Sequence, residues 1–218
     1  MTASGTAATP AIALARAPIE PIAAMKLGKK QETQQTTVRM ATVNAVPVVP
    51  FFSQFTDISS PYWEKVGCGI TDLTMIIDYY HPDAATVNEM LHKGIAAGAY
   101  DYNAGWIYQG LINLSHAYGL RGRYYDLDGL PQQTALARFE SLLGSGPVIL
   151  SVHYQFNPAS AIPHLIVVNG INDNVVYYND PATTKGTQST SLQNFLRGWK
   201  RKIIVIRPDT TAVATKNS

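Results

Sequence analysis

The sequence has very little cysteine, and Cys68 is the only one among 218 residues. Within one chain this excludes a disulfide framework and a zinc site made of several thiolates. Charge is also scarce: Asp, Glu, Lys and Arg make up 15% of the residues, and the net charge is +2. So small a net charge does not indicate a nucleic-acid-binding surface. No apolar run approaches the roughly 20 residues needed to cross a bilayer, so we expect no membrane span.

Composition divides the chain into a domain and two tails. Residues 1–44 are rich in Ala, Thr and Pro, and we predict a flexible or variable extension there. Residues 45–208 are long enough for one domain with a full core, and residues 209–218 form a short tail. The apolar stretch at 11–15 is preceded by no basic residue and stops at Arg16, which is not typical of a secretory signal. A cytoplasmic location is favoured, while a processed or truncated start leaves export open.

The hydrophobic periodicity predicts an α+β fold. An extended segment or edge strand with two prolines comes first, at 46–52. Helical spacing then predicts helices at about 70–80, 84–97, 104–118, 132–143 and 192–199. Alternating or apolar runs predict strands at 121–125, 147–153, 164–169, 175–179 and 202–207. Helices that precede antiparallel strands are typical of an architecture with the helices on one side of the sheet.

Cys68 lies where a loop turns into the first predicted helix. The unpaired N–H groups of a first helical turn are one environment that activates a thiol. Gly67 and Gly69 flank the cysteine, and we expect them to leave room for a substrate backbone. A free cysteine is also commonly a small buried hydrophobic residue, so position alone leaves both interpretations open.

A predicted hairpin supplies a base for this thiol. His164 begins an apolar strand, and a second strand ends at Asp180. A turn centred on Asn172 would place the two residues directly opposite each other, close enough for the carboxylate to orient the imidazole. A shift of one residue in the turn would instead bring up Asn179 or Pro181. Asp180 is also compatible with simple turn chemistry in its Asn-Asp-Pro sequence.

His153 is an alternative to this pair, and Gln54 is an addition to it. His153 stands at another strand end, where it more simply caps a buried strand. A metal site of His153, His164 and Asp180 is an alternative, but no ligand-type spacing supports it. Gln54 follows the first extended segment, and its amide can serve as an oxyanion donor beside the Cys68 N–H or lie in a surface loop.

Four segments together carry a family resemblance. They are the residues at 49–54 (Val-Pro-Phe-Phe-Ser-Gln), 67–80 (beginning Gly-Cys-Gly-Ile-Thr-Asp), 163–171 (beginning Pro-His-Leu-Ile) and 176–182 (ending Asn-Asp-Pro-Ala). In this order they resemble the C39-like cysteine peptidases, a branch of the papain-like superfamily. The resemblance covers about residues 46–207.

The resemblance implies a papain-like fold, no cofactor and a peptide or protein substrate. It also implies that Cys68 is the nucleophile, His164 the base, Asp180 its orienting carboxylate and Gln54 an oxyanion donor. Two positions depart from the family pattern, because Ile70 stands where proline is common and Gly67 where aspartate is common. No nucleotide-binding or membrane region is evident, so we expect a stand-alone domain for which cleavage of double-glycine leaders does not carry over automatically.

The sequence therefore predicts a cysteine peptidase that works through a Cys-His-Asp triad and a covalent acyl-enzyme. An acyltransferase or amidase with the same triad is one alternative, since only the acceptor of the acyl group differs. A binding module that has kept the cleft and lost turnover is the other.

Overall fold

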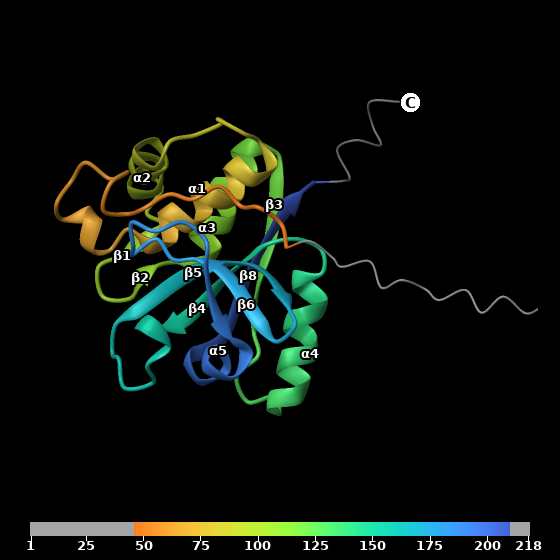
Figure 1. Cartoon of the computed structure of the whole chain (residues 1–218). Helices are drawn as coiled ribbons and strands as arrows, with labels where there is room; N and C mark the ends of the chain where they lie inside the picture. The colour runs from red at the N-terminus through yellow and green to blue at the C-terminus, as the bar shows by residue number, and fades with distance from the viewer. Residues whose placement is uncertain (1–45, 210–218) are drawn as a thin grey trace, which may run out of the picture. The chain divides into compact units, whose positions relative to one another are not determined.

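A central antiparallel sheet organises residues 46–209, which are the part of the chain that the computed structural model describes (Figure 1). The extension predicted at 1–44 lies outside this part, as does the C-terminal tail beyond residue 209. The sheet has six strands in the order β3-β8-β4-β5-β6-β7. Its strands are β3 (Leu120–Asp126), β4 (Val148–His153), β5 (Pro163–Asn172), β6 (Val175–Asn179), β7 (Gln188–Ser191) and β8 (Trp199–Pro208).

Three helices pack on one face of this sheet. They are α1 (Cys68–Tyr80), α2 (Val87–Ala96) and α3 (Tyr108–Ser115). Leu73 and Ile76 of α1 share a core with Ile149 and Val167 of the sheet. Every residue of α1 from Gly69 to Ile77 is buried, so the helix is enclosed on all sides. The partly exposed residues of α1 lie at its two ends, and Cys68 is the one at its start.

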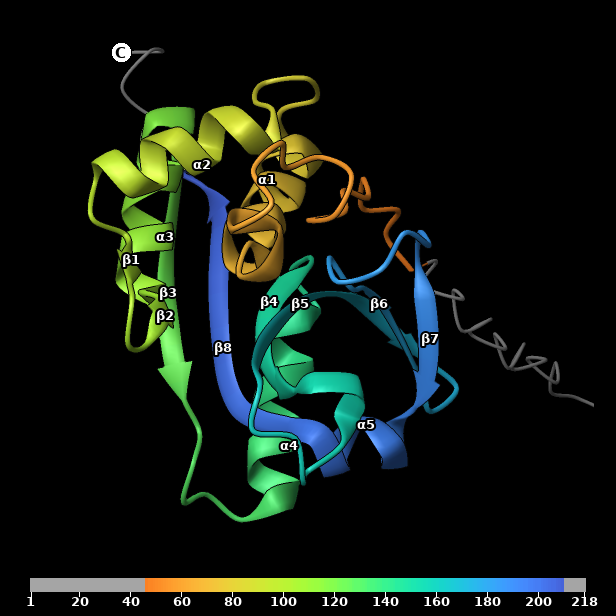
Figure 2. The same cartoon turned by 90° about the vertical axis from the view of Figure 1, so that its left-hand side faces the viewer.

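Two more helices cover the opposite face (Figure 2). These are α4 (Gln132–Leu143) and α5 (Leu192–Gly198). Phe139 of α4 and Phe195 of α5 stack with ring centroids 5.4 Å apart and join the second core, which contains Leu150 and Ile166. The predicted α+β class, with N-terminal helices on a C-terminal antiparallel sheet, is confirmed. The expectation that all helices lie on one side is wrong, because the alternate residues of β4 and β5 are apolar on both faces.

The segment before α3 differs from the predicted helix at 104–118. Residues 100–106 form a small hairpin of β1 (Tyr100–Asp101) and β2 (Gly105–Trp106), and α3 begins only at Tyr108. Gly105 has a φ of +86°, which ends any helix passing through it. The start of α2 is also later than predicted, because Thr86 and Glu89 form a capping box there.

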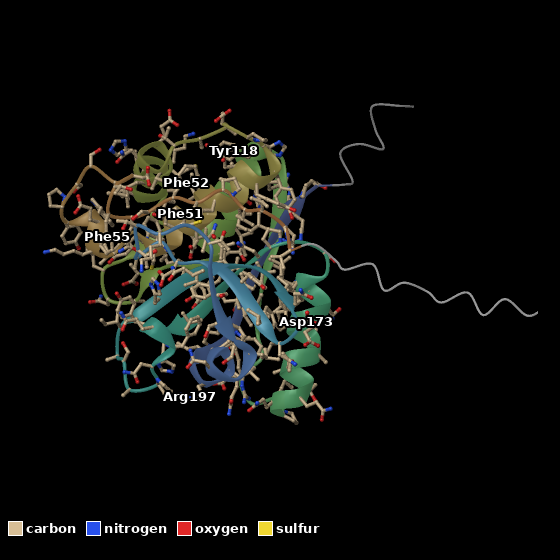
Figure 3. The ribbon with its side chains drawn as sticks, in the orientation of Figure 1. Phe51, Phe52, Phe55, Tyr118, Asp173 and Arg197 are labelled. Atoms are coloured by element: carbon tan, nitrogen blue, oxygen red, sulfur yellow. The ribbon has the colours of Figure 1, made fainter. Side chains whose placement is uncertain are left out.

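The β5–β6 hairpin has a different register from the predicted one. Its turn consists of Asp173 and Asn174, whose φ values of 49° and 61° suit a two-residue hairpin turn (Figure 3). Asn172 therefore pairs directly with Val175, and a bulge farther along the strands shifts the register again. The predicted turn centred on Asn172 is wrong, because these two residues tolerate the left-handed backbone that the tighter turn requires.

Two smaller differences complete the comparison. Residues 46–52 do not join the sheet, so of the two predicted forms the extended segment is the one observed. Asn179 holds this segment in place through its Nδ2, which donates to the backbone oxygens of Val49 and Pro50 at 3.1 Å each. The polar edge strand β7 was not predicted, because it lacks an apolar alternation.

Candidate active site

Cys68 is the first residue of α1 and is partly exposed. Gly67 precedes the helix as its N-cap, and no side chain caps the first turn. The backbone N–H of a first helical residue has no partner within the helix, so the Cys68 N–H is free to donate to a bound group. The fold thus presents a thiol and a backbone donor at the same point.

The glycines beside Cys68 serve the fold rather than a substrate, contrary to the prediction. A Cβ added to Gly69 would lie 2.7 Å from Cγ of Trp106, so this indole already occupies the space. A Cβ added to Gly67 would lie 2.2 Å from the side chain of Ile58 and 3.4 Å from Cβ of Gln54. The space beside both glycines is therefore occupied by the protein's own side chains, which pack directly against the start of α1.

His164 and Asp180 are in contact although they are not directly opposed. The hairpin ladder ends with the pair Val167 and Asn179, so Asp180 follows β6 and is a diagonal neighbour of His164. Diagonal neighbours on one face remain within reach of long side chains. Nε2 of His164 lies 2.7 Å from Oδ1 of Asp180. The same oxygen accepts the Ala182 N–H at 2.8 Å, so Asp180 both orients the imidazole and closes the following turn.

The charge of His164 is controlled by its two neighbours. Burial alone lowers the pKa of this imidazole, but hydrogen bonds and charge interactions with Asp180 and Cys68 outweigh burial and raise the pKa from 6.5 to about 10. At neutral pH His164 is therefore protonated. Because Nε2 faces Asp180, Nδ1 is the ring nitrogen that remains for other partners.

Gln54 reaches the same place from the extended segment. Its backbone N–H donates to the Pro181 oxygen at 2.9 Å, which ties it to the residue after Asp180. Its side-chain Nε2 donates to the Glu64 oxygen at 2.6 Å and keeps a second hydrogen. Its Oε1 is buried with no partner among the described residues. Gln54 follows an extended segment that is not a strand, and its side chain lies beside Gly67 and lines the same cavity as Cys68.

These side chains meet at one cavity of about 530 Å³. Cys68, His164 and Gln54 line it, and Asp180 lies behind His164. His153 does not join them, because its Nδ1 pairs with the Ser160 oxygen at 3.1 Å. Within residues 46–209 no group of three His, Cys, Asp or Glu side chains is placed to hold a metal ion. The structure thus brings together the four predicted residues and separates the alternative histidine from them.

Three aromatic residues near the site have different positions. Tyr154 lines the cavity and meets the His164 ring edge to face, with centroids 5.3 Å apart. Phe156 is buried in the core against Tyr178. Trp63 lies behind the cavity wall, where it contacts the ring of Tyr100 with centroids 5.0 Å apart. Sequence reasoning did not separate these roles, because all three residues are aromatic and close to a strand or helix end.

Asp72 is a further titratable residue of the site that sequence reasoning missed. It lies one turn after Cys68 on α1 and is fully buried. Neither of its carboxylate oxygens has a hydrogen-bond partner within the described chain. Burial raises the pKa of the Asp72 carboxyl well above its usual value; the charges of Cys68 and Asp180 raise it further, and His164 opposes them. An acidic residue one turn after the cysteine, in a helix rich in apolar residues, was the available signal.

The Trp106 indole makes a wall of the cavity that is testable by substitution. Its Nε1 donates to the Val66 oxygen at 2.7 Å, so the ring cannot swing away without breaking this bond. We expect Gly69→Ala to destabilise the fold by about 1–3 kcal/mol through overpacking. Urea unfolding measures the change, and Gly186→Ala is the matched control, because a Cβ there meets nothing within 4 Å. Equal stabilities of the two variants would contradict a fixed indole.

Solved structures of other proteins resemble the fold of this chain. Three solved structures share the fold with TM-scores of 0.51. The first is a double-glycine motif protease from an AMS/PCAT transporter in complex with its leader peptide, 20% identical over 74% of this chain and 92% of that chain. The second is the peptidase domain of Streptococcus ComA, 18% identical over 66% and 93%. The third is a putative C39-like peptidase from Bacillus anthracis, 17% identical over 74% and 95%.

The chain is a C39-type, papain-like domain. It belongs to the peptidase C39-like family, whose model matches residues 47–202. No curated protein matches the chain significantly. Among the described residues, no helix is long and apolar enough to cross a membrane.

Proposed function

We propose that this protein is a cysteine peptidase in which Cys68 attacks the carbonyl carbon of a peptide bond. The observation that carries the proposal is the 2.7 Å contact between His164 and Asp180 beside the partly exposed thiol at the start of α1. A positioned base and a third group that orients it are what a cysteine nucleophile requires. The family membership supports a peptidase-type activity.

Each residue has a defined step in this mechanism. The Cys68 thiolate adds to the carbonyl carbon, and the oxyanion is stabilised by the Cys68 N–H and the second hydrogen of Gln54 Nε2. The protonated His164 gives its proton to the leaving amine, and a thioester forms on Cys68. His164 then removes a proton from water, which attacks the thioester and releases the carboxylic acid. Asp180 keeps Nε2 of the imidazole engaged throughout.

A peptide digest tests the activity directly. The protein is incubated with a diverse peptide library, with and without an added amine, and the products are identified by mass spectrometry. We expect cleavage by the wild-type protein and none by Cys68→Ala. Products carrying the added amine in place of water would instead identify an acyltransferase.

The alkylation rate of Cys68 distinguishes a peptidase from a binding module without turnover. A free cysteine has a pKa near 8.5, so an unactivated thiol reacts slowly with iodoacetamide at about pH 6. We expect Cys68 to be alkylated at that pH far faster than free cysteine. A rate equal to that of free cysteine, together with no cleavage in the digest, would argue for a site without turnover.

A further inference from the structure

The cavity beside Cys68 is far more apolar than the proposed chemistry requires. Apart from the residues of the proposed mechanism, its walls are built mainly of aromatic and aliphatic side chains. These side chains include Tyr100, Tyr102, Trp106, Tyr154, Ile162 and Phe55. A volume of about 530 Å³ falls within the range of pockets that bury a whole ligand group. A site for two consecutive glycines would need no such space.

One wall of the cavity is rigid and lies immediately next to the thiol. Trp106 packs on Gly69, the neighbour of Cys68, and also on Gly94 of α2, where an added Cβ would lie 2.9 Å from the indole. The ring of Tyr100 contacts this indole edge to face, with centroids 5.2 Å apart. The wall is therefore preformed by the β1–β2 hairpin, and binding against it requires no ordering of these rings.

The rim of the cavity exposes apolar side chains to solvent. Tyr102 is 73% exposed, Ile162 57% and Phe55 45%, and Figure 3 labels the last of these at the edge of the molecule. Large apolar side chains exposed around a hollow are typical of a surface that another molecule covers. Their burial by a ligand stabilises the complex in proportion to the apolar area removed from water.

The charges around the cavity also restrict what it accepts. Among the described residues that line it, Lys65 and the protonated His164 carry positive charge, and no Asp or Glu is present. A basic side chain entering the cavity would meet charges of its own sign and no carboxylate. A neutral side chain of large apolar area would contact the apolar walls and would not be repelled by these charges.

We infer that this cavity receives a large apolar or aromatic side chain of a peptide. This inference rests on the proposed function and gives it a substrate class: peptides with Phe, Tyr, Trp, Leu or Ile within about two residues of the scissile bond. Such selectivity is unlike that of a protease for double-glycine motifs. Burial of one such side chain in place of glycine corresponds to at least about tenfold in kcat/KM.

The test uses pairs of internally quenched peptides that differ at one position next to the bond found in the digest. We expect kcat/KM to fall at least about tenfold from Phe or Leu to Gly, and further for Lys. Tyr102→Ala should reduce the preference for Phe over Gly several-fold. Tyr124→Ala is the matched control, because Tyr124 is a similarly exposed tyrosine on β3 that does not line the cavity. Equal rates for Phe and Gly peptides would overturn the inference.

A second measurement separates failure of this inference from failure of the proposed function. The Cys68→Ala variant is titrated by calorimetry with a Phe-containing and a Gly-containing peptide, and wild-type Cys68 is alkylated with iodoacetamide, a reagent too small to need the cavity. Rapid alkylation without a preference for Phe would overturn the inference and leave the peptidase proposal standing. Selective binding of the Phe peptide with slow alkylation would support the cavity and overturn the peptidase proposal.

Discussion

His164→Gln is expected to lower kcat/KM for peptide cleavage by at least about a thousandfold, the size of effect seen when one member of a catalytic triad is removed. Glutamine can still hydrogen-bond to Asp180, but it cannot accept and return a proton. The loss should therefore appear mainly in kcat, because the walls of the cavity remain intact. Steady-state kinetics with a quenched peptide measures the effect.

His153→Gln is the matched control for this prediction. Both histidines lie on neighbouring strands, but His153 pairs with the Ser160 oxygen and not with Asp180. We expect this variant to keep wild-type activity within a few-fold. A comparable loss in both variants would mean that the effect comes from damage to the sheet and not from removal of the base.

The same substitution should change how stability depends on pH. Because the pKa of His164 is raised from 6.5 to about 10 in the folded state, its proton stabilises the fold. This stabilisation is complete below about pH 6.5 and is lost as the pH rises towards 10. We expect the free energy of unfolding of the wild type to fall over this interval and that of His164→Gln to fall less.

Asp72→Asn is expected to stabilise the protein, increasingly so as the pH rises. The raised pKa of Asp72 means that the unfolded chain releases this proton above about pH 3.8 while the folded chain retains it. Its contribution to stability is therefore present in full at low pH and is lost as the pH rises through the folded-state pKa. The advantage of the variant should therefore grow as the pH rises above 3.8 and level off once the folded-state carboxyl has also lost its proton.

Urea unfolding at several pH values measures this advantage. Asp78→Asn removes a carboxylate from the same helix and controls for the loss of one formal charge; Asp78 accepts the Asp83 N–H at 2.7 Å and is not enclosed. An advantage for Asp72→Asn that does not grow as the pH rises above 3.8 would contradict a raised pKa of the Asp72 carboxyl.

The predictable parts of this protein are those set by local patterns. Helical spacing predicted α1 at 70–80, close to its observed bounds, and apolar runs predicted β4, β5 and β6. The contact between His164 and Asp180 was predicted through the wrong register, because the pairing depends on a two-residue turn and a bulge that the strand pattern does not specify. The contact forms despite this error, since diagonal residues on one face also meet.

The unpredicted parts depend on contacts between distant segments. The β1–β2 hairpin has two residues per strand, and its aromatic rings are ordered by packing on the start of α1 rather than by strand propensity. Gly69 was interpreted as space for a substrate because the sequence does not show that Trp106, 37 positions later, fills it. The buried state of Asp72 likewise depends on β4, β5 and β8, which pack against α1 and lie more than 70 positions away.

The position of β8 determines when during synthesis the site can exist. This strand comes last along the described chain but lies between β3 and β4 in the sheet. The sheet beneath α1 is therefore incomplete until residues 199–208 have emerged from the ribosome. The thiol is translated about 130 residues earlier. At synthesis rates of about 5–20 residues per second, Cys68 spends roughly 7–26 seconds on a nascent chain without its assembled partners. The proposed nucleophile is therefore completed only with β8, the last strand of the described chain.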